Sequence, residues 1–286
     1  MFSNKSTTAS SSSKISHTLK SWFLRKIYLI LLIKNLTKAA SIISEREIFD
    51  LTHDNFLESL SQCVSLTYLD LGGNNLKCSA DHSDHLFRTL VNLEHLDLSD
   101  MGLTYLDPNT FEANTNLIHL DLSDNHLIEE LNANIFDVNT KLKYLSLHGN
   151  HVTLNSNIFE KFVALEHLNL SQMGLTFLDP NIFQTNTNLT ELYLFRNKLS
   201  EFNPVLLEKN TQLKVLYLGA NSLADLDPII IKNLTHLEEL DLMDAKLRTL
   251  DLSMFDNLLK LKILHLGTLF LINNVGLGDR LKILAG

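Results

Sequence analysis

One apolar pattern recurs through this chain and constrains its fold more than any other feature. Residues 117–127 read L-x-x-L-x-L-x-x-N-x-L, and successive copies are offset by 27, 24, 25, 23, 24, 24, 24 and 24 residues. The nine copies begin at Leu66, Leu93, Leu117, Leu142, Leu165, Leu189, Leu213, Leu237 and Leu261. A period maintained over nine copies predicts a solenoid, in which each repeat adds one strand and one return segment.

The spacing within the motif predicts the shape of each repeat. In a strand, successive side chains point to opposite faces, so L-x-L sends the leucines into the core and the intervening residue outward. Neighbouring strands then pair in parallel, and the longer return segments curve the stack. We therefore predict an α/β solenoid of horseshoe shape, with the parallel sheet on its concave face. Irregular, 3-10 or short helical segments are expected on the convex side.

Two further columns of residues support the same register. Phe87, Phe111, Phe136, Phe159, Phe183 and Phe255 each lie six residues before the next first leucine, where Leu207 and Ile231 occupy the equivalent positions. All four prolines, Pro108, Pro180, Pro204 and Pro228, follow the last motif leucine by five residues. Each repeat is therefore expected to bury a phenylalanine or aliphatic residue behind the strand, after an irregular segment that often contains proline.

The asparagine of the motif lies where the chain leaves the strand. Its amide can bond the backbone groups of the adjacent turn, which would otherwise be buried without partners. This column reads Asn74, Met101, Asn125, Asn150, Met173, Asn197, Asn221, Ala245 and Leu269. The two methionine turns lack the amide and must satisfy their backbone in another way.

The motif, the 24-residue period and the Leu-Asp-Pro-Asn-x-Phe strings resemble one subfamily of repeat proteins. Variants of that string occupy residues 106–111 and 178–183. Together these features are similar to the extracellular, "typical" leucine-rich repeats of Toll-like receptor ectodomains and related insect cell-surface proteins. The resemblance covers about residues 60–284. It implies recognition of a protein or microbial ligand outside the cell, in innate immunity or adhesion.

The sequence outside the repeats predicts four regions. Residues 1–40 combine a basic, Ser-rich start with the seven-residue apolar run 27–33, which favours a secretory signal over a disordered tail. That run is too short to cross a bilayer. Residues 41–62 are predicted to cap the solenoid, and residues 63–269 hold the nine repeats. Residues 270–286 form either an irregular cap or a truncated further repeat.

Charge and cysteine content narrow the classes of partner and compartment. The formal net charge is −9, and residues 1–40 hold seven basic and no acidic residues. The remainder has 17 basic against 33 acidic residues, a charge of −16, which argues against general binding of nucleic acid. Cys63 and Cys78 are the only cysteines. A disulfide between them would suit an oxidising compartment, and two unpaired thiols are the alternative.

The outward strand positions include two candidate binding patches. The first comprises Glu191, Tyr193, Phe195, Arg196 and Tyr217, because exposed aromatic residues beside an arginine are typical of interface hot spots. Aromatic stacking between strands would explain the same residues without a ligand.

The second patch comprises His95, Asp97, His119 and Asp121 on two neighbouring strands. It suggests a metal site or a pH switch. Mutually paired His and Asp side chains are the favoured alternative, so no metal is assigned. The sequence shows no catalytic motif, and we expect neither an enzyme nor a cofactor.

Three sequons within the repeats could carry N-linked glycans, at Asn169, Asn188 and Asn233. Asn169 falls in an outward column of the concave face, whereas the other two fall on the sides. These features favour a secreted or surface-associated recognition protein. An intracellular repeat scaffold and a truncated receptor ectodomain without independent function are the alternatives.

Overall fold

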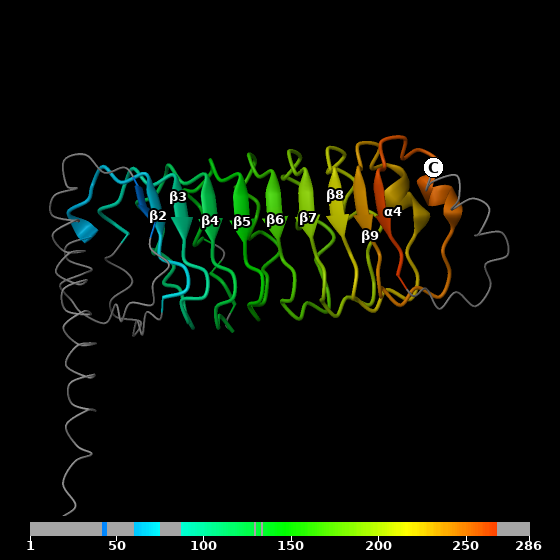
Figure 1. The fold of residues 1–286 in the computed structure, drawn as a ribbon, viewed down its shortest axis with the longest axis horizontal. Coiled ribbons are helices and arrows are strands. Elements are labelled where there is room, and N and C mark those ends of the chain that lie inside the picture. Colours follow the sequence, from blue (N-terminus) through cyan, green and yellow to red (C-terminus); the bar gives the residue numbers. More distant parts are fainter. Residues whose placement is uncertain (1–41, 45–59, 75–86, 129, 133, 268–286) are drawn as a thin grey trace, which may run out of the picture.

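A computed structural model describes residues 42–44, 60–74, 87–128, 130–132 and 134–267. Ten three-residue strands form a single parallel sheet in sequence order, side by side along the long axis of the molecule (Figure 1). They are β1 (Ile42–Ser44), β2 (Tyr68–Asp70), β3 (His95–Asp97), β4 (His119–Asp121), β5 (Tyr144–Ser146), β6 (His167–Asn169), β7 (Glu191–Tyr193), β8 (Val215–Tyr217), β9 (Glu239–Asp241) and β10 (Ile263–His265). Strands β2 to β10 coincide with the nine motif copies, so the predicted solenoid is confirmed.

The second leucine of the motif fixes the register of the sheet. Leu96 pairs with Leu120, Leu120 with Leu145 and Leu145 with Leu168, although the intervening repeats differ in length. From Leu69 to Leu240 this leucine is completely buried in every strand. Since an isolated repeat could not bury its own leucine, the fold is stabilised by contacts between neighbouring repeats.

The predicted phenylalanine column forms a continuous stack behind the sheet. Phe87, Phe111 and Phe136 are stacked with ring centroids 6.2 and 6.0 Å apart, and Phe159 and Phe183 continue the pattern at 6.1 Å. Phe162 bridges the two groups, with its centroid 5.4 Å from that of Phe136 and 6.3 Å from that of Phe159. The aromatic column therefore fills the back of the core across five successive repeats.

The motif asparagines bond the turns as expected. The Asn125 amide nitrogen donates to the carbonyl oxygens of Leu98, Leu122 and Ser123 at 2.9, 2.9 and 3.1 Å. Its oxygen accepts from the backbone nitrogens of Met101 and Leu103, both at 3.0 Å. The backbone amides of a methionine turn thus donate to the asparagine of the next repeat. Asn197 accepts from the turn at Met173 in the same way.

A second asparagine ladder, which the sequence analysis missed, runs through the return segments. Its members are Asn114, Asn139, Asn186 and Asn210, each completely buried and three residues after the phenylalanine position. Each amide nitrogen donates to two carbonyl oxygens of the preceding repeat at 2.9 to 3.3 Å. This ladder ties the back of neighbouring repeats together.

The convex segments contain little helix, as predicted, and several of them begin with a side-chain cap. In α4 (Pro228–Lys232) the Asp227 carboxylate accepts from the Ile229 amide, and in the 3-10 helix η1 (Leu252–Phe255) Asp251 accepts from Ser253. Asp107 and Asp179 make the same contact with the residue two positions later. The prolines follow these capping residues because proline suits the first position of a helical turn.

Several predictions fall wholly or partly outside the described residues. The signal segment 1–40, most of the cap 41–62, the segment 270–286 and Cys78 lie there, and they stay predictions. Within the predicted cap, β1 pairs in parallel with β2. Among the described residues there is no helix long and apolar enough to cross a membrane.

Candidate functional site

A column of aromatic rings runs across the concave face, the sheet face that carries the outward side chains. Tyr68, His95, His119 and Tyr144 are stacked with successive centroids 4.0, 3.9 and 3.9 Å apart and planes within 14° of parallel. His167 continues the column at 6.2 Å with a tilted ring. We call these five residues the ring ladder. The in-register parallel strands produce it, because they place equivalent side chains directly beside one another.

The ring ladder favours neutral imidazoles at its centre. Burial, followed by the charge of neighbouring His95, lowers the pKa of His119 from 6.5 to about 4. Burial also lowers the pKa of His95, against the opposing effect of Asp97. A ring stacked between two others loses hydration on both faces, which disfavours its charged form. His119 is therefore uncharged at neutral pH and contributes a flat, half-buried surface.

The aspartates beside the ring ladder bond the turn that follows each strand. The Ser99 amide donates to Asp97 at 2.9 Å, and the Ser123 amide donates to Asp121 at 2.8 Å. Asp241 makes the equivalent contact with Met243. These hydrogen bonds show that the aspartates stabilise the turns. Within the described residues, no group of three or more His, Cys, Asp or Glu is arranged to hold a metal ion.

Three residues of the first predicted patch, Glu191, Tyr193 and Tyr217, belong to a hydrogen-bonded cluster over β6 to β10. The Tyr193 hydroxyl donates to Glu191 Oε2 at 2.7 Å, and the His167 Nδ1 lies 3.0 Å from that oxygen. One strand further on, the Tyr217 hydroxyl donates to Glu239 Oε1, and the His265 Nε2 lies 3.7 Å from it. The two tyrosine rings meet edge to face, with centroids 5.0 Å apart. We call these six residues the Tyr–Glu cluster.

The carboxylates keep both tyrosines in their neutral, donating form. The hydrogen bond to Glu239, followed by burial, raises the pKa of Tyr217 to about 12. Burial, followed by the hydrogen bond to Glu191, raises the pKa of Tyr193 even further. Three members of the cluster, His167, Glu239 and His265, were not predicted as site residues, although all three lie in outward columns. The sequence indicates that these residues lie on the outward face, but it does not indicate which side chains form hydrogen bonds with one another.

Phe195 and Arg196 lie at the end of β7, beside the cluster. The Arg196 guanidinium lies over the Phe195 ring, 5.4 Å from its centroid. Arg196 has a φ of 56°, in the left-handed region, because it occupies the turn position directly before the motif asparagine. Phe195 is half-buried, whereas Arg196 is exposed. The pair therefore borders the concave face and does not belong to a strand.

The predicted modification sites are partly described. Asn169 is half-buried on β6, paired in register with Tyr193, and its side-chain oxygen accepts from Ser171. Asn188 and Asn233 are exposed on the flanks, and Asn233 ends α4. Cys63 is buried. Whether it is bonded to Cys78, and whether any sequon carries a glycan, stay predictions.

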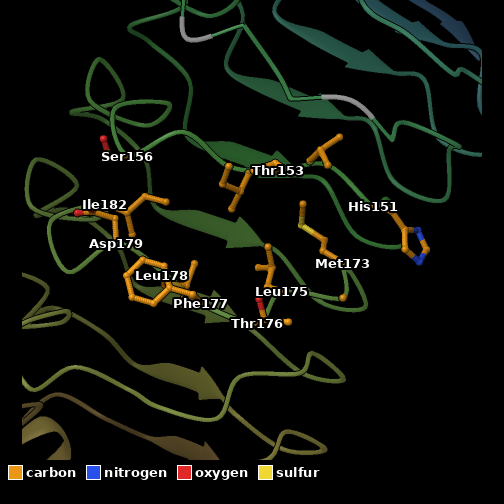
Figure 2. Close-up of a pocket in the computed structure, with 13 residues that line it drawn as sticks. His151, Thr153, Ser156, Met173, Leu175, Thr176, Phe177, Leu178, Asp179 and Ile182 are labelled. Carbon is orange, nitrogen blue, oxygen red and sulfur yellow. The ribbon is translucent and has the colours of Figure 1, made fainter.

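A hollow of about 390 Å³ lies between the segments that follow β5 and β6 (Figure 2). In this view Met173 and Leu175 lie between His151 at one end and Asp179 at the other. The hollow occurs where the 23-residue repeat, whose return segment is one residue shorter than usual, meets a repeat of normal length. It leaves Phe177 65% exposed. We interpret it as a consequence of repeat length.

The parallel sheet, the asparagine ladder and the repeat spacing agree with sequence comparison. The family model described as "Leucine rich repeat" matches residues 79–127, 91–152, 163–223 and 211–268. The chain belongs to the leucine-rich repeat family. Solenoids of this kind are suited to protein–protein recognition, and the described fold agrees with that use.

Solved structures show the same fold in this leucine-rich repeat chain and in receptors. A chain of the TLR13–ssRNA13 complex has a TM-score of 0.66 at 30% identity, over 77% of this chain and 31% of that one. The Toll–Spatzle complex of Drosophila gives 0.63 at 24% identity, over 79% and 33%. A leucine-rich repeat protein of Leptospira interrogans gives 0.66 at 28% identity, over 75% and 52%. No curated protein matches the sequence.

This leucine-rich repeat chain thus spans 31 to 52% of the length of these three solved chains. The Toll neighbour was solved with a protein partner, whereas TLR13 was solved with single-stranded RNA. The fold by itself therefore does not support the predicted exclusion of nucleic acid. That prediction depends on the charge of this chain.

Proposed function

We propose that this leucine-rich repeat chain recognises a protein ligand outside the cell through its concave face, as part of a secreted or surface-associated, receptor-like protein. The observation that carries the proposal is the Tyr–Glu cluster, together with the ring ladder. Large rings are not needed on the solvent side of the sheet, whose core is already filled by leucine and phenylalanine. Aromatic side chains in such positions are typical of protein-binding surfaces. A role in innate immunity or adhesion is consistent with the Toll-like neighbours.

Charge supports a protein ligand over nucleic acid. Three columns of residues line the concave face, at the positions two, four and six residues after the first leucine of each motif copy, and they contain no lysine or arginine. Six of their positions are acidic, namely Asp70, Asp97, Asp121, Glu191, Glu239 and Asp241. A phosphate backbone would meet repulsion on this face, since binding to it relies on basic side chains.

A glycan introduced on the concave face tests the proposal directly. Asp121→Asn creates a sequon with Ser123, and the new amide oxygen can still accept from the Ser123 backbone, as Asn169 does from Ser171. The matched control is Glu94→Thr, which creates a sequon at flank residue Asn92. The Asn92 amide donates to the preceding repeat, as that of Asn188 does.

Both variants are expressed in a eukaryotic secretory host, and mass spectrometry measures signal cleavage, glycan occupancy and the Cys63–Cys78 bond. We expect processed protein in the medium. We also expect extracellular proteins captured by the wild type to be lost with the concave glycan and retained with the flank glycan. Unprocessed, reduced protein in the lysate would instead favour an intracellular scaffold. Equal capture by all three proteins would remove the concave face as the binding surface.

A further inference from the structure

The two glutamates of the Tyr–Glu cluster differ from every aspartate on the concave face in what they bond. Asp97, Asp121 and Asp241 each accept from a backbone amide of the turn that follows, so they serve the fold. Glu191 and Glu239 accept from tyrosine hydroxyls and contact histidines, and among the described residues neither accepts from a backbone amide. Their carboxylates are therefore not explained by turn formation.

In each of these carboxylates one oxygen has two partners, and the other has none among the described residues. Tyr193 and His167 both contact Glu191 Oε2, and Tyr217 and His265 both contact Glu239 Oε1. Within the described part of the chain, no hydrogen bond or ion pair involves Glu191 Oε1 or Glu239 Oε2. The glutamate side chains are 30% and 22% exposed, so they remain open to solvent while the tyrosines hold them in place.

The spacing of the two carboxylates follows from the strand order. Glu191 and Glu239 occupy the same column on β7 and β9, with Val215 of β8 between them. Two strand spacings of about 4.8 Å place their backbones roughly 10 Å apart. The edge-to-face tyrosines lie beside this column. Two held carboxylates, the valine between them and two aromatic rings make a site for extended cationic side chains, whose stems can pack on rings and whose charges meet carboxylates.

We propose that the Tyr–Glu cluster binds a basic segment of a protein partner, with one lysine or arginine at Glu191 and another at Glu239. This inference rests on the proposed function and names the chemistry of the ligand at that surface. Charge complementarity favours a basic ligand, because the concave columns contain acidic residues and no lysine or arginine. A second copy of this acidic chain would place like charges together at the same surface.

A labelled probe peptide measures this chemistry without the natural partner. The probe is a 15-residue peptide of five Lys-Gly-Ser units, about 10 Å between lysines when extended, and a Glu-Gly-Ser peptide is its control. The test variant is Glu191→Gln/Glu239→Gln, which removes both charges but keeps a side-chain oxygen that can accept from each tyrosine. The matched control, Glu160→Gln/Glu208→Gln, removes two charges that are more exposed, at 50% and 54%, and that pair with adjacent lysines on the return segments.

We expect fluorescence anisotropy at low salt to show binding of the lysine peptide and no binding of the glutamate peptide. The cluster variant should bind at least about tenfold more weakly, and the control variant should bind within about twofold of the wild type. Equal weakening in both variants would show a general effect of net charge and would overturn the proposal, as would absence of binding. If a partner captured through the concave face binds the cluster variant normally, the proposed function stands and this inference fails.

Discussion

The neutral state of His119 predicts a loss of stability between pH 7 and pH 5. Its ring is stacked 3.9 Å from both His95 and Tyr144, and its pKa falls from 6.5 to about 4 on folding. Between these two values the unfolded chain binds a proton that the folded chain does not bind. The neutral His119 therefore makes its full contribution to the free energy of unfolding above pH 6.5, and this contribution is lost as the pH falls towards 4.

The magnitude follows from the same two pKa values. At pH 5, a pKa difference of this size lowers the free energy of unfolding by about 2 kcal/mol relative to its value at neutral pH. Because the ring is only partly buried, we expect about 1 to 2 kcal/mol. His119→Tyr removes the titration and retains an aromatic ring, as Tyr68 and Tyr144 do in the same column.

Urea unfolding followed by circular dichroism at pH 7 and pH 5 measures the effect. The wild type should lose about 1 to 2 kcal/mol more than His119→Tyr over this range. Replacement of exposed His126 by tyrosine is the control and should leave the pH dependence unchanged. If His119→Tyr loses as much stability as the wild type, the stacked and neutral imidazole does not control the acid response.

Two further predictions concern the spine of the solenoid, and both are measured as changes in the free energy of unfolding. Asn125→Ala removes five hydrogen bonds to buried backbone groups and should cost about 2 to 4 kcal/mol, whereas Asn116→Ala removes two exposed bonds, to Val91 and Lys141, and should cost less than about 1 kcal/mol. Equal costs would show that the ladder is not a structural element. Leu168→Ala should cost about 2 to 5 kcal/mol through an unfilled cavity, against less than about 0.5 kcal/mol for exposed Val163→Ala. A small effect at Leu168 would indicate that neighbouring repeats can collapse into the gap.

The leucine and motif-asparagine patterns predicted the sheet because each residue type has the same structural role wherever it occurs in the motif. A leucine at the motif position is buried in every strand from β2 to β9, and Asn125 bonds the backbone groups that the motif suggested. The second ladder was harder to see, because asparagine occupies its position in only some repeats. Leu90, Phe162 and Leu234 occur there in others, which hides the column in the sequence.

The candidate site was predicted less completely, since residue types in a column do not determine hydrogen bonds. Asp97 next to His95 suggested a pair or a metal site, but Asp97 accepts a hydrogen bond from the backbone amide of Ser99, two residues later in the turn. The sequence also placed Tyr217 correctly without indicating that it donates to Glu239 on the next strand. Which of these hydrogen bonds forms depends on the side-chain rotamers and on the distance to each possible partner.

The unequal repeats have a consequence for how this surface can change. Repeats of 25 and 23 residues follow one another, yet β4, β5 and β6 remain in register, and the difference is taken up in the return segments, including the hollow beside Phe177. Insertions and deletions on the return side can therefore accumulate without displacing a residue of the sheet. Ligand specificity and repeat length can evolve independently, by substitution on one side of the solenoid and by length change on the other.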